Sequence, residues 1–497
     1  MPLPLIGEIL QRDPRRPALW FNGRWYSYAD LDERATRLAR RLQSLGVGPG
    51  DPVTVLALNH LVHFDLFLAA ARLGFVYAPL NRRLAPEHLG GLVAQLKPRF
   101  AFLDSRHLHH ASLFSCGWTR LADYRDWLAA GEARPLPDRS PDPESLWMMM
   151  GTGGSTGAPK WVGLPYRQIL ANARATVAGW GLREDDCAIQ ATPCFHVSVN
   201  VLVPPLLSVG GRIVLMPQYD PGDYLDHLRR HQATQLFLAP NLYQWLIDHR
   251  EFGHTDFSGV RRAISGGAPL PDPVAERLRE RGLSVYPGYG LTEAGVNCFA
   301  HAADDTPSVT HCVGRPLPGI EAVVRKPDGA PCPVGEIGEL TLAGSQLCAG
   351  YPLQPEEWAR QFHQGWLWTG DLASTDSEGR FFIHGRRKDS YLSAGETVYP
   401  AEIEMALMRC GGVRDCAVIS VPDARWGEAG VAVVSVEPGF KLDPPQLREA
   451  LRAELPDYKL PSRILLAASL PRTAAGKIDR PALRRQLVDS VHEDTRQ

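Results

Sequence analysis

The sequence has almost no excess of charge of either sign. Its 53 lysines and arginines are balanced by 55 aspartates and glutamates, which leaves a formal net charge of −2. Nucleic acids and anionic membranes bind surfaces with a basic excess, so neither partner is expected and any phosphate chemistry must be local. The most apolar stretch, residues 199–216, is interrupted by prolines, glycines and an arginine. This pattern argues against a membrane span.

Cysteine is sparse and lacks any paired spacing. The nine cysteines include no CxxC pair, so neither a zinc site nor a disulfide framework is indicated, and small buried thiols are expected. The first residues carry no basic segment ahead of their short apolar run, and that run contains Glu8, so no signal peptide is expected. We therefore expect a cytoplasmic protein with a sizeable globular core.

The hydrophobic pattern alternates between helical and strand-like periods. Residues 27–46 begin with a serine that can cap a helix and end at a glycine, and residues 52–58 then form a buried apolar run. Further buried strands are expected at 75–80, 211–216, 234–240 and 260–267. This alternation predicts a wound α/β fold with largely parallel sheets.

The pattern of apolar, charged and turn-forming residues changes twice towards the C-terminus. Residues 321–344 are short strand-like segments separated by glycine and proline turns, which predicts a small β-barrel. The charged segment GRRKD at 385–389 follows, and the residues after it predict a small mobile α+β domain. We therefore divide the chain into an N-terminal domain, residues 1–385, and a C-terminal domain, residues 386–497.

Residues 150–160, MGTGGSTGAPK, form a glycine-rich loop that ends in a lysine. Main-chain NH groups of such a loop can approach phosphate oxygens closely, because glycine has no Cβ to block them. The spacing is not that of a Walker A loop, since Pro159 precedes Lys160 and Trp161 follows it. Taken alone, the segment is better explained as a surface turn, because clusters of glycine, serine and threonine between elements usually form loops.

Further motifs follow this loop in a defined order. They are TPCFHVSVN at 192–200, SGGAPL at 265–270, YPGYGLTEAG at 286–295, WLWTGD at 366–371, GRRKDSYLSAGETVYPAEIE at 385–404 and PRTAAGKIDR at 471–480. Together they resemble the adenylate-forming superfamily of acyl-CoA synthetases, luciferases and nonribosomal-peptide adenylation domains, and acid–CoA ligases most closely. The resemblance implies an acid–thiol ligase that uses ATP, Mg²⁺ and coenzyme A.

The resemblance also implies a role for each nucleotide-binding motif. Residues expected to hold the ATP phosphates are Thr152, Ser155, Thr156, Gly157 and Lys160, and those expected to hold adenine and ribose are Gly267, Ala268, Pro269, Tyr289, Asp371 and Arg386. Thr292 is expected to contact the α-phosphate and Glu293 to bind Mg²⁺. Three residues depart from the family pattern of the first loop, namely Gly153, Trp161 and Tyr166.

For the C-terminal domain, the resemblance implies two poses. Lys477 is expected to be the catalytic lysine of adenylation, because a mobile ammonium stabilises the charge that develops on the α-phosphate. Lys388 matches the hinge about which the domain rotates between the half-reactions. In the second pose Gly395 is expected to border the tunnel for the pantetheine arm of coenzyme A, with Glu396 beside it.

The segment around His196 indicates which class of carboxylic acid the enzyme would use. His196 stands where amino-acid-activating members of the family have an aspartate, which favours an acid without an amino group, and it resembles the histidine that gates the acyl tunnel and assists catalysis. Ser198 and Val199 replace glycines found in many fatty-acid enzymes. Their bulk predicts an acyl pocket for short- or medium-chain, branched or aromatic acids.

Three functions remain open at this point. The first is a free-standing acid–CoA ligase, favoured because no carrier domain follows PRTAAGKIDR. The second is an adenylating enzyme that loads an acyl carrier protein, since both acceptors present the same pantetheine arm. The third is a nucleotide-binding homologue without catalytic activity, suggested by Gly153, Trp161 and Tyr166.

Overall fold

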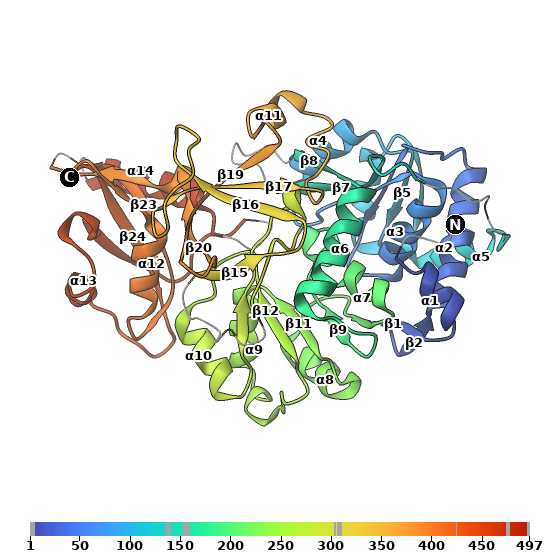
Figure 1. Ribbon diagram of the computed structural model, residues 1–497, viewed down its shortest axis with the longest axis horizontal. Helices are drawn as coiled ribbons and strands as arrows, with labels where there is room; N and C mark the ends of the chain where they lie inside the picture. The colour runs from blue at the N-terminus through green and yellow to red at the C-terminus, as the bar shows by residue number, and fades with distance from the viewer. Residues whose placement is uncertain are drawn as a thin grey trace.

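The computed structural model of the chain describes residues 5–134, 136, 141–152, 160–302, 305, 311–423, 425–473 and 478–494. Its strands form four sheets, and Figure 1 shows the chain passing from two α/β layers through a central antiparallel sheet to a separate C-terminal domain. The predicted α/β class, with a large N-terminal part and a small C-terminal domain, is confirmed.

The first sheet has the strand order β6-β5-β3-β4-β7-β8 and is parallel except for the β7–β8 pair. Its inner strands are buried on both faces, as a parallel sheet covered by helices requires. The strands are β3 (Pro52–Leu56), β4 (Val76–Pro79), β5 (Phe100–Leu103), β6 (Gly117–Arg120), β7 (Leu146–Thr152) and β8 (Lys160–Pro165).

Helices cover both faces of this sheet, because alternate residues of each strand point to opposite sides. One face packs against α2, α3 and α5 and the other against α4. The helices of this region are α1 (Gly7–Arg12), α2 (Tyr28–Ser44), α3 (Leu61–Leu73), α4 (Pro86–Leu96) and α5 (Tyr124–Ala129). The predicted start of α2 is confirmed, since Ser27 and Asp30 form a capping box.

The second sheet has the order β13-β12-β11-β9-β10-β1-β2 and is parallel from β13 to β1. The chain leaves β9 towards β10 on one side and returns to β11 on the other, so the strand order reverses at β9. The strands are β1 (Pro17–Phe21), β2 (Arg24–Ser27), β9 (Cys187–Gln190), β10 (Arg212–Leu215), β11 (Gln235–Leu238), β12 (Arg262–Ser265) and β13 (Val285–Pro287). Such a reversal leaves a crevice at the carboxyl ends of the strands.

The two sheets share one hydrophobic core. Helices α3, α6 and α7 contribute side chains to a single buried cluster with strands of both sheets, while α8, α9 and α10 cover the outer face of the second sheet. The helices are α6 (Tyr166–Trp180), α7 (Val203–Val209), α8 (Pro221–His231), α9 (Pro240–Asp248) and α10 (Asp272–Glu280). The segment that joins β9 to α7 therefore lies between the two layers.

The third sheet contains the antiparallel strands predicted from residue 321 onwards, but it begins earlier in the chain, at β14. It is antiparallel, with the order β14-β15-β20-β19-β17-β16 and β18 paired to β19. The elements are β14 (Phe299–Ala300), β15 (Cys312–Pro316), β16 (Ile320–Arg325), β17 (Gly338–Gly344), α11 (Pro355–Ala359), β18 (Phe362–His363), β19 (Trp366–Thr375) and β20 (Phe381–Arg386). A 3₁₀ turn at Arg387–Asp389 follows β20, next to the predicted domain boundary.

The C-terminal domain is built on a fourth sheet, β22-β21-β24-β23 with β25 beside β24. Helices α12 and α13 pack on one face of this sheet and α14 on the other. The elements are β21 (Tyr391–Ser393), β22 (Glu396–Val398), α12 (Pro400–Met408), β23 (Val413–Asp423), β24 (Gly427–Val436), α13 (Pro444–Arg452), β25 (Arg463–Ala467) and α14 (Arg480–Asp494). The described helices include none with the length and continuous apolar character that a membrane crossing requires.

Candidate active site

The predicted site residues meet at the carboxyl ends of the second sheet. Ser265 of β12 pairs with Pro287 of β13, so the glycine strip that follows β12 and the segment that follows β13 begin side by side. The main-chain NH of Gly288 donates a 2.7 Å hydrogen bond to the Ser265 carbonyl and fixes the two ends together. The sheet thus places the segments that carry the residues predicted to bind adenine next to each other at one end of β12 and β13.

Close packing explains the glycines in this crevice. Gly267 has a φ of +89°, and a Cβ on Gly288 would lie 2.7 Å from the Ile264 Cγ2 atom. A Cβ on Gly290 would lie 2.0 Å from the Val296 carbonyl oxygen. Gly267, Ala268 and Pro269 are exposed. Tyr289 is half-buried, and in sequence it lies between Gly288 and Gly290. An exposed strip beside an aromatic ring is suited to hold a flat base.

Asp371 lies at the centre of a polar network beside Tyr289. The Tyr289 hydroxyl donates to the Asp371 Oδ2 at 2.6 Å, and the Arg386 Nε lies 2.6 Å from Oδ1. Burial and the adjacent Asp371 carboxylate raise the pKa of Tyr289 well above its ordinary value, so Tyr289 stays a neutral donor. Strands β19 and β20 create the ion pair, because Asp371 and Arg386 are directly opposite in their register.

Thr292 and Glu293 form a 3₁₀ turn after β13. The Gln168 side chain of α6 donates a 3.0 Å hydrogen bond to the Thr292 carbonyl, and the Tyr351 hydroxyl donates a 2.9 Å bond to the Glu293 Oε1. A single carboxylate suits Mg²⁺, which takes few protein oxygens and keeps water and phosphate ligands. The described residues contain no group of three or more histidine, cysteine, aspartate or glutamate side chains that could hold a metal.

The flanks of the glycine-rich loop are fixed by strand pairing. Thr152 of β7 is directly opposite Lys160 of β8 in their antiparallel register. The Lys160 ammonium makes an ion pair with Glu357 of α11 and lies 5.2 Å from the centre of the Tyr351 ring. Its side chain is only 7% exposed. The predicted phosphate-binding residues Ser155, Thr156 and Gly157 lie outside the described residues.

Two of the three departures from the family pattern have a structural reason. The Trp161 indole is buried and its Nε1 donates to the Leu92 carbonyl of α4 at 3.3 Å. The Tyr166 ring stacks on Trp147, and its hydroxyl donates to the Ala70 carbonyl at 3.0 Å. Both aromatic side chains therefore pack in the core of the first layer. Gly153 lies outside the described residues.

The segment after β9 carries the residues predicted to contact the acid. The main-chain NH of Ser198 donates to the His196 Nδ1 at 3.2 Å, so His196 caps the short 3₁₀ turn Val197–Val201. The Ser198 hydroxyl donates to Thr192 at 3.1 Å. Asn59 fixes the start of the segment, because its amide donates to the Thr192 and Met216 carbonyls and its oxygen accepts from the Cys194 NH.

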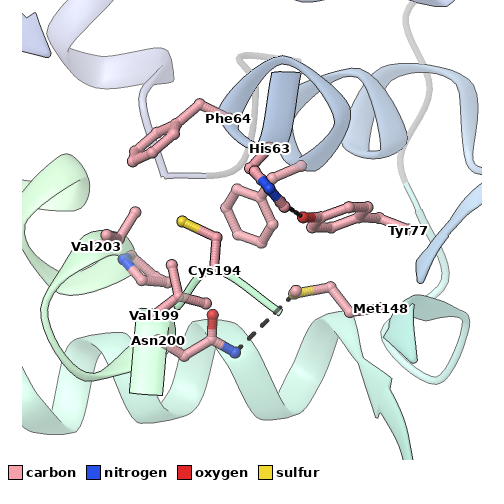
Figure 2. A pocket seen from close by; sticks show the side chains of 10 residues that line it. His63, Phe64, Tyr77, Met148, Cys194, Val199, Asn200 and Val203 are labelled. Atoms are coloured by element: carbon pink, nitrogen blue, oxygen red, sulfur yellow. Dashed lines mark hydrogen bonds between the residues drawn. The ribbon is translucent and has the colours of Figure 1, made fainter. Parts of the chain in front are cut away.

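Two cavities flank this segment. The first cavity is small and is lined by His63, Phe64, Phe67, Tyr77, Met148, Cys194, Val199, Asn200, Val203 and Pro204 (Figure 2). The second cavity, also small, is lined by Leu164, Gln168, Ile169, Asn172, Val197, Asn200, Pro204, Thr292, Gly295 and Val296. Of the predicted acyl-pocket residues, Val199 lines the first cavity, whereas His196 and Ser198 line neither.

Comparison with known proteins identifies the family. Residues 8–352 match the AMP-binding enzyme family, and residues 402–477 match the C-terminal domain of AMP-binding enzymes. The chain belongs to the AMP-binding enzyme family. The predicted superfamily and the predicted class of enzyme, an acid–thiol ligase, are both confirmed.

Three known proteins are similar to this AMP-binding enzyme over almost their whole length. The chain is 34% identical to a feruloyl-CoA synthase of Amycolatopsis sp over 482 residues, which cover 95% of this chain and 96% of that protein. It is 31% identical to the fatty acid–[acyl-carrier-protein] ligase ScoC of Streptomyces coeruleorubidus, over 98% of this chain and 95% of that protein. The crystal structure of ATP-bound MatB from Rhodopseudomonas palustris superposes with a TM-score of 0.90 at 29% identity and covers 98% of this chain and 99% of that chain.

The C-terminal motifs of this AMP-binding enzyme lie at the border with the N-terminal part. Lys388 is exposed in the 3₁₀ turn that follows β20. Gly395 and Ala394 form the two-residue turn between β21 and β22, with φ values of +83° and +54°, and Glu396 opens β22. Such a pair of positive φ values is typical of a tight hairpin turn. Lys477 lies outside the described residues, and the adjacent Arg480 pairs with Glu404 at 2.7 Å.

Sequence reasoning missed several residues of the site. Tyr351 and Glu357 follow β17 in a segment without a recognised chemical motif, and only the fold brings them to Glu293 and Lys160. Asn59 was detectable in principle, because it is a polar residue directly after the predicted strand 52–58. Polar residues at the carboxyl ends of parallel strands often line a binding crevice.

Proposed function

We propose that this AMP-binding enzyme is an ATP-dependent acid–CoA ligase that works through an acyl-adenylate, with a compact aromatic or short- to medium-chain acid as substrate. The observation that carries the proposal is the position of Thr292. Thr292 adjoins Glu293 in the nucleotide crevice, and it also lines the second cavity. One residue therefore borders both the predicted α-phosphate position and a cavity lined by the segment that is predicted to contact the acid.

The nucleotide is proposed to bind across the crevice in an extended arrangement. Adenine lies along Gly267 to Pro269 and against Tyr289, and the ribose hydroxyls bind Asp371 with Arg386 beside it. The phosphates extend towards Lys160 and the glycine-rich loop with Thr152, Ser155, Thr156 and Gly157. Glu293 would hold Mg²⁺, which would neutralise phosphate charge.

In the first half-reaction, a carboxylate oxygen of the acid attacks the α-phosphorus of ATP. A new oxygen–phosphorus bond forms, the bond to the bridging oxygen of the β-phosphate breaks, and pyrophosphate leaves. Thr292 donates a hydrogen bond to the α-phosphate, and Lys477 supplies a positive charge beside it. Both contacts matter most in the transition state, where negative charge develops on the phosphoryl oxygens.

In the second half-reaction, the sulfur of coenzyme A attacks the acyl carbon. A carbon–sulfur bond forms, the bond between the acyl carbon and the phosphate oxygen breaks, AMP leaves, and the thiol proton passes to solvent. Rotation about Lys388 is proposed to bring the Gly395–Glu396 hairpin to the crevice for this step. The rotation moves Lys477 away from the α-phosphate position, since one domain cannot present Lys477 and the Gly395–Glu396 hairpin to one site in the same pose.

The segment after β9 supports a compact acid. Ser198 and Val199 are both buried, so their side chains occupy space that glycines would leave open. Val199 narrows the first cavity from the β9–α7 segment. His196 is proposed to gate the carboxylate end of the acid next to these cavities.

A substrate panel tests the proposal directly. The protein is incubated with MgATP, coenzyme A and aromatic and straight-chain acids of increasing length, and acyl-AMP and acyl-CoA are followed by mass spectrometry. Adenylate and thioester from a compact acid are expected, and Lys477→Ala should abolish adenylate formation. Preferential turnover of the longest chains would contradict the substrate class, and adenylation by Lys477→Ala at the wild-type rate would contradict the role of the lysine.

The alternative acceptor is an acyl carrier protein. It is favoured by the similarity to ScoC over almost the whole of both chains. The same panel with a holo carrier protein in place of coenzyme A separates the two, because the faster acceptor identifies the second substrate. The third possibility, a catalytically inactive homologue, loses support because Trp161 and Tyr166 pack in the core of the first layer, where they are compatible with an intact nucleotide site.

A further inference from the structure

The carboxylate of Glu339 lies where the third sheet meets the turn that carries Lys388. Glu339 is on β17, which pairs with β19, and β19 pairs in turn with β20, the last strand before that turn. Figure 1 shows these strands in the central sheet, next to the C-terminal domain. The Glu339 side chain is only 6% exposed. A carboxylate buried to this extent needs protein partners for its oxygens.

The two oxygens of Glu339 bind two different segments. The main-chain NH of Gly370 donates a 3.0 Å hydrogen bond to Oε1, and the Arg387 Nε lies 3.2 Å from Oε2. Arg325, which is directly opposite Glu339 in the register of β16 and β17, donates instead to the Thr341 hydroxyl at 3.1 Å. Glu339 therefore connects a residue of β19 to the first residue of the turn after β20.

These two partners flank the proposed ribose site. Asp371 of β19 and Arg386 of β20 are opposite each other in register. Gly370 directly precedes Asp371, and Arg387 directly follows Arg386. Because β20 ends at Arg386, the strand ladder stops at this pair, and the Glu339 carboxylate makes the next connection beyond it.

The turn after β20 is held on both sides of Lys388. Arg387 is bound to the N-terminal part through Glu339, and the Asp389 carboxylate lies 3.7 Å from the Nε of Arg480 in the C-terminal domain. Lys388 is exposed between these two residues. A change in the backbone dihedrals of Lys388 would leave both ion pairs intact, since each lies on its own side of that residue. Rotation is then confined to Lys388 as long as both pairs hold.

We propose that Glu339 is a positioning residue for both half-reactions. Through Gly370 it orients Asp371 towards the ribose, and through Arg387 it fixes the stationary side of the hinge. This inference rests on the proposed roles of Asp371 and Lys388. Glutamine at position 339 keeps an oxygen that can accept from Gly370 but loses the charge that holds Arg387, whereas leucine loses both contacts.

The contact with Gly370 is tested with ATP and 2′-deoxy-ATP in pyrophosphate exchange that depends on the acid. The wild type should prefer ATP in kcat/KM, because 2′-deoxy-ATP lacks a hydroxyl that Asp371 is proposed to bind. Glu339→Leu should lower this preference roughly threefold or more, mainly through KM, and Glu339→Gln should largely restore it. General structural damage would lower kcat/KM for both nucleotides by one factor and leave the preference unchanged. Glu336→Gln, which breaks a 2.9 Å surface pair with Lys326, is the control.

The contact with Arg387 is tested by single-turnover kinetics. Enzyme that has formed the acyl-adenylate is mixed with the thiol acceptor, and the rate of thioester formation is compared with the rate of adenylation. Arg387→Gln and Glu339→Gln should each lower that ratio roughly threefold, a modest effect because the Arg387 side chain is 69% exposed. The double variant should match the single variants, since all three lack the same ion pair. Arg380→Gln breaks a 2.7 Å pair with Asp376 at the other end of the β19–β20 hairpin and is the control.

Three outcomes would overturn the inference. They are an unchanged nucleotide preference in Glu339→Leu, a double variant that is slower than both single variants, and a wild type without preference for ATP, which would also contradict the role of Asp371. Absence of pyrophosphate exchange with every acid in the wild type would instead contradict the proposed ligase function. If Glu339→Leu fails to fold, the comparison of Arg387→Gln with the double variant decides the inference, because Arg387 is a surface residue.

Discussion

The Tyr351 hydroxyl and the Glu293 carboxylate are joined by a 2.9 Å hydrogen bond. The two residues lie in segments that follow strands of different sheets. Glu293 follows β13 of the second sheet, and Tyr351 follows β17 of the third. Tyr351 also lies between Glu293 and Lys160, whose ammonium is 5.2 Å from its ring centre. The tyrosine thus connects the proposed Mg²⁺ ligand to the flank of the glycine-rich loop.

Tyr351→Phe should weaken the use of Mg²⁺ without removing any ligand. Loss of one hydrogen bond of about 1 kcal/mol leaves Glu293 less well oriented, so the Mg²⁺ concentration at half-maximal adenylation should rise roughly fivefold. Pyrophosphate exchange as a function of Mg²⁺ measures this. Tyr219→Phe removes a hydroxyl that donates to the Leu242 carbonyl at 2.7 Å, outside the site, and serves as the control. Equal Mg²⁺ dependence in both variants would contradict the positioning role.

Glu357→Gln should destabilise the protein by about 1–2 kcal/mol, because it leaves the Lys160 ammonium buried without its counter-charge. The side chains of Lys160 and Glu357 are 7% and 28% exposed, so solvent screens the pair only in part. Urea unfolding measures the change. Glu449→Gln breaks a 2.8 Å pair with Arg452 on the open surface and should shift stability by less than about 0.5 kcal/mol. Two equal shifts would show that burial of Lys160 carries no cost.

The pH dependence of stability should depend in part on His63. Its folded pKa, about 3, lies below its ordinary value of 6.5, so the unfolded chain binds more protons between these two values. Its contribution is therefore fully present above pH 6.5 and is lost as the pH falls towards 3. Between pH 7 and pH 5 this loss amounts to about 2 kcal/mol. His63→Gln should flatten the curve of unfolding free energy against pH by that amount, and parallel curves would refute the assignment.

Gly395→Val should separate the two half-reactions. Gly395 has a φ of +83° in the tight turn of the β21–β22 hairpin, and a branched side chain there strains the turn and blocks the proposed pantetheine tunnel. Adenylation should stay within about twofold of the wild type, whereas thioester formation should fall at least tenfold, about 1.4 kcal/mol. Gly439→Val introduces a comparable strain at a φ of +89° elsewhere in the domain and is the control. A similar loss in both variants would indicate general damage.

Local chemistry made much of the fold predictable. The Ser27 cap, the buried run at 52–58 and the alternation of helix and strand are short-range signals, and the structure contains each corresponding element. The residues proposed to bind nucleotide were predicted from a resemblance to a family, and the parallel register of β12 and β13 explains why the segments that carry Gly267 and Tyr289 begin side by side.

Contacts between distant segments were not predictable in the same way. Lys160 and Glu357 are 197 residues apart, and His63 meets Tyr77 only because α3 packs on β4. From sequence, Trp161 was recognised only as a departure from the family motif, and the structure shows that its indole packs against α4. Such features depend on which face of an element meets which layer, and residue spacing alone does not determine that.

The pairing of Asp371 with both Tyr289 and Arg386 has a thermodynamic consequence. Arg386 ends β20 and is followed directly by the exposed turn that contains Lys388. A ribose bound at Asp371, as we propose, would compete with the guanidinium for the carboxylate oxygens and so change the restraint at the start of that turn. Linkage requires the reverse effect to be equal: any rotation that draws Arg386 away from Asp371 changes the affinity for nucleotide by the same factor. In the proposed mechanism, release of AMP and return of the C-terminal domain would then be thermodynamically coupled.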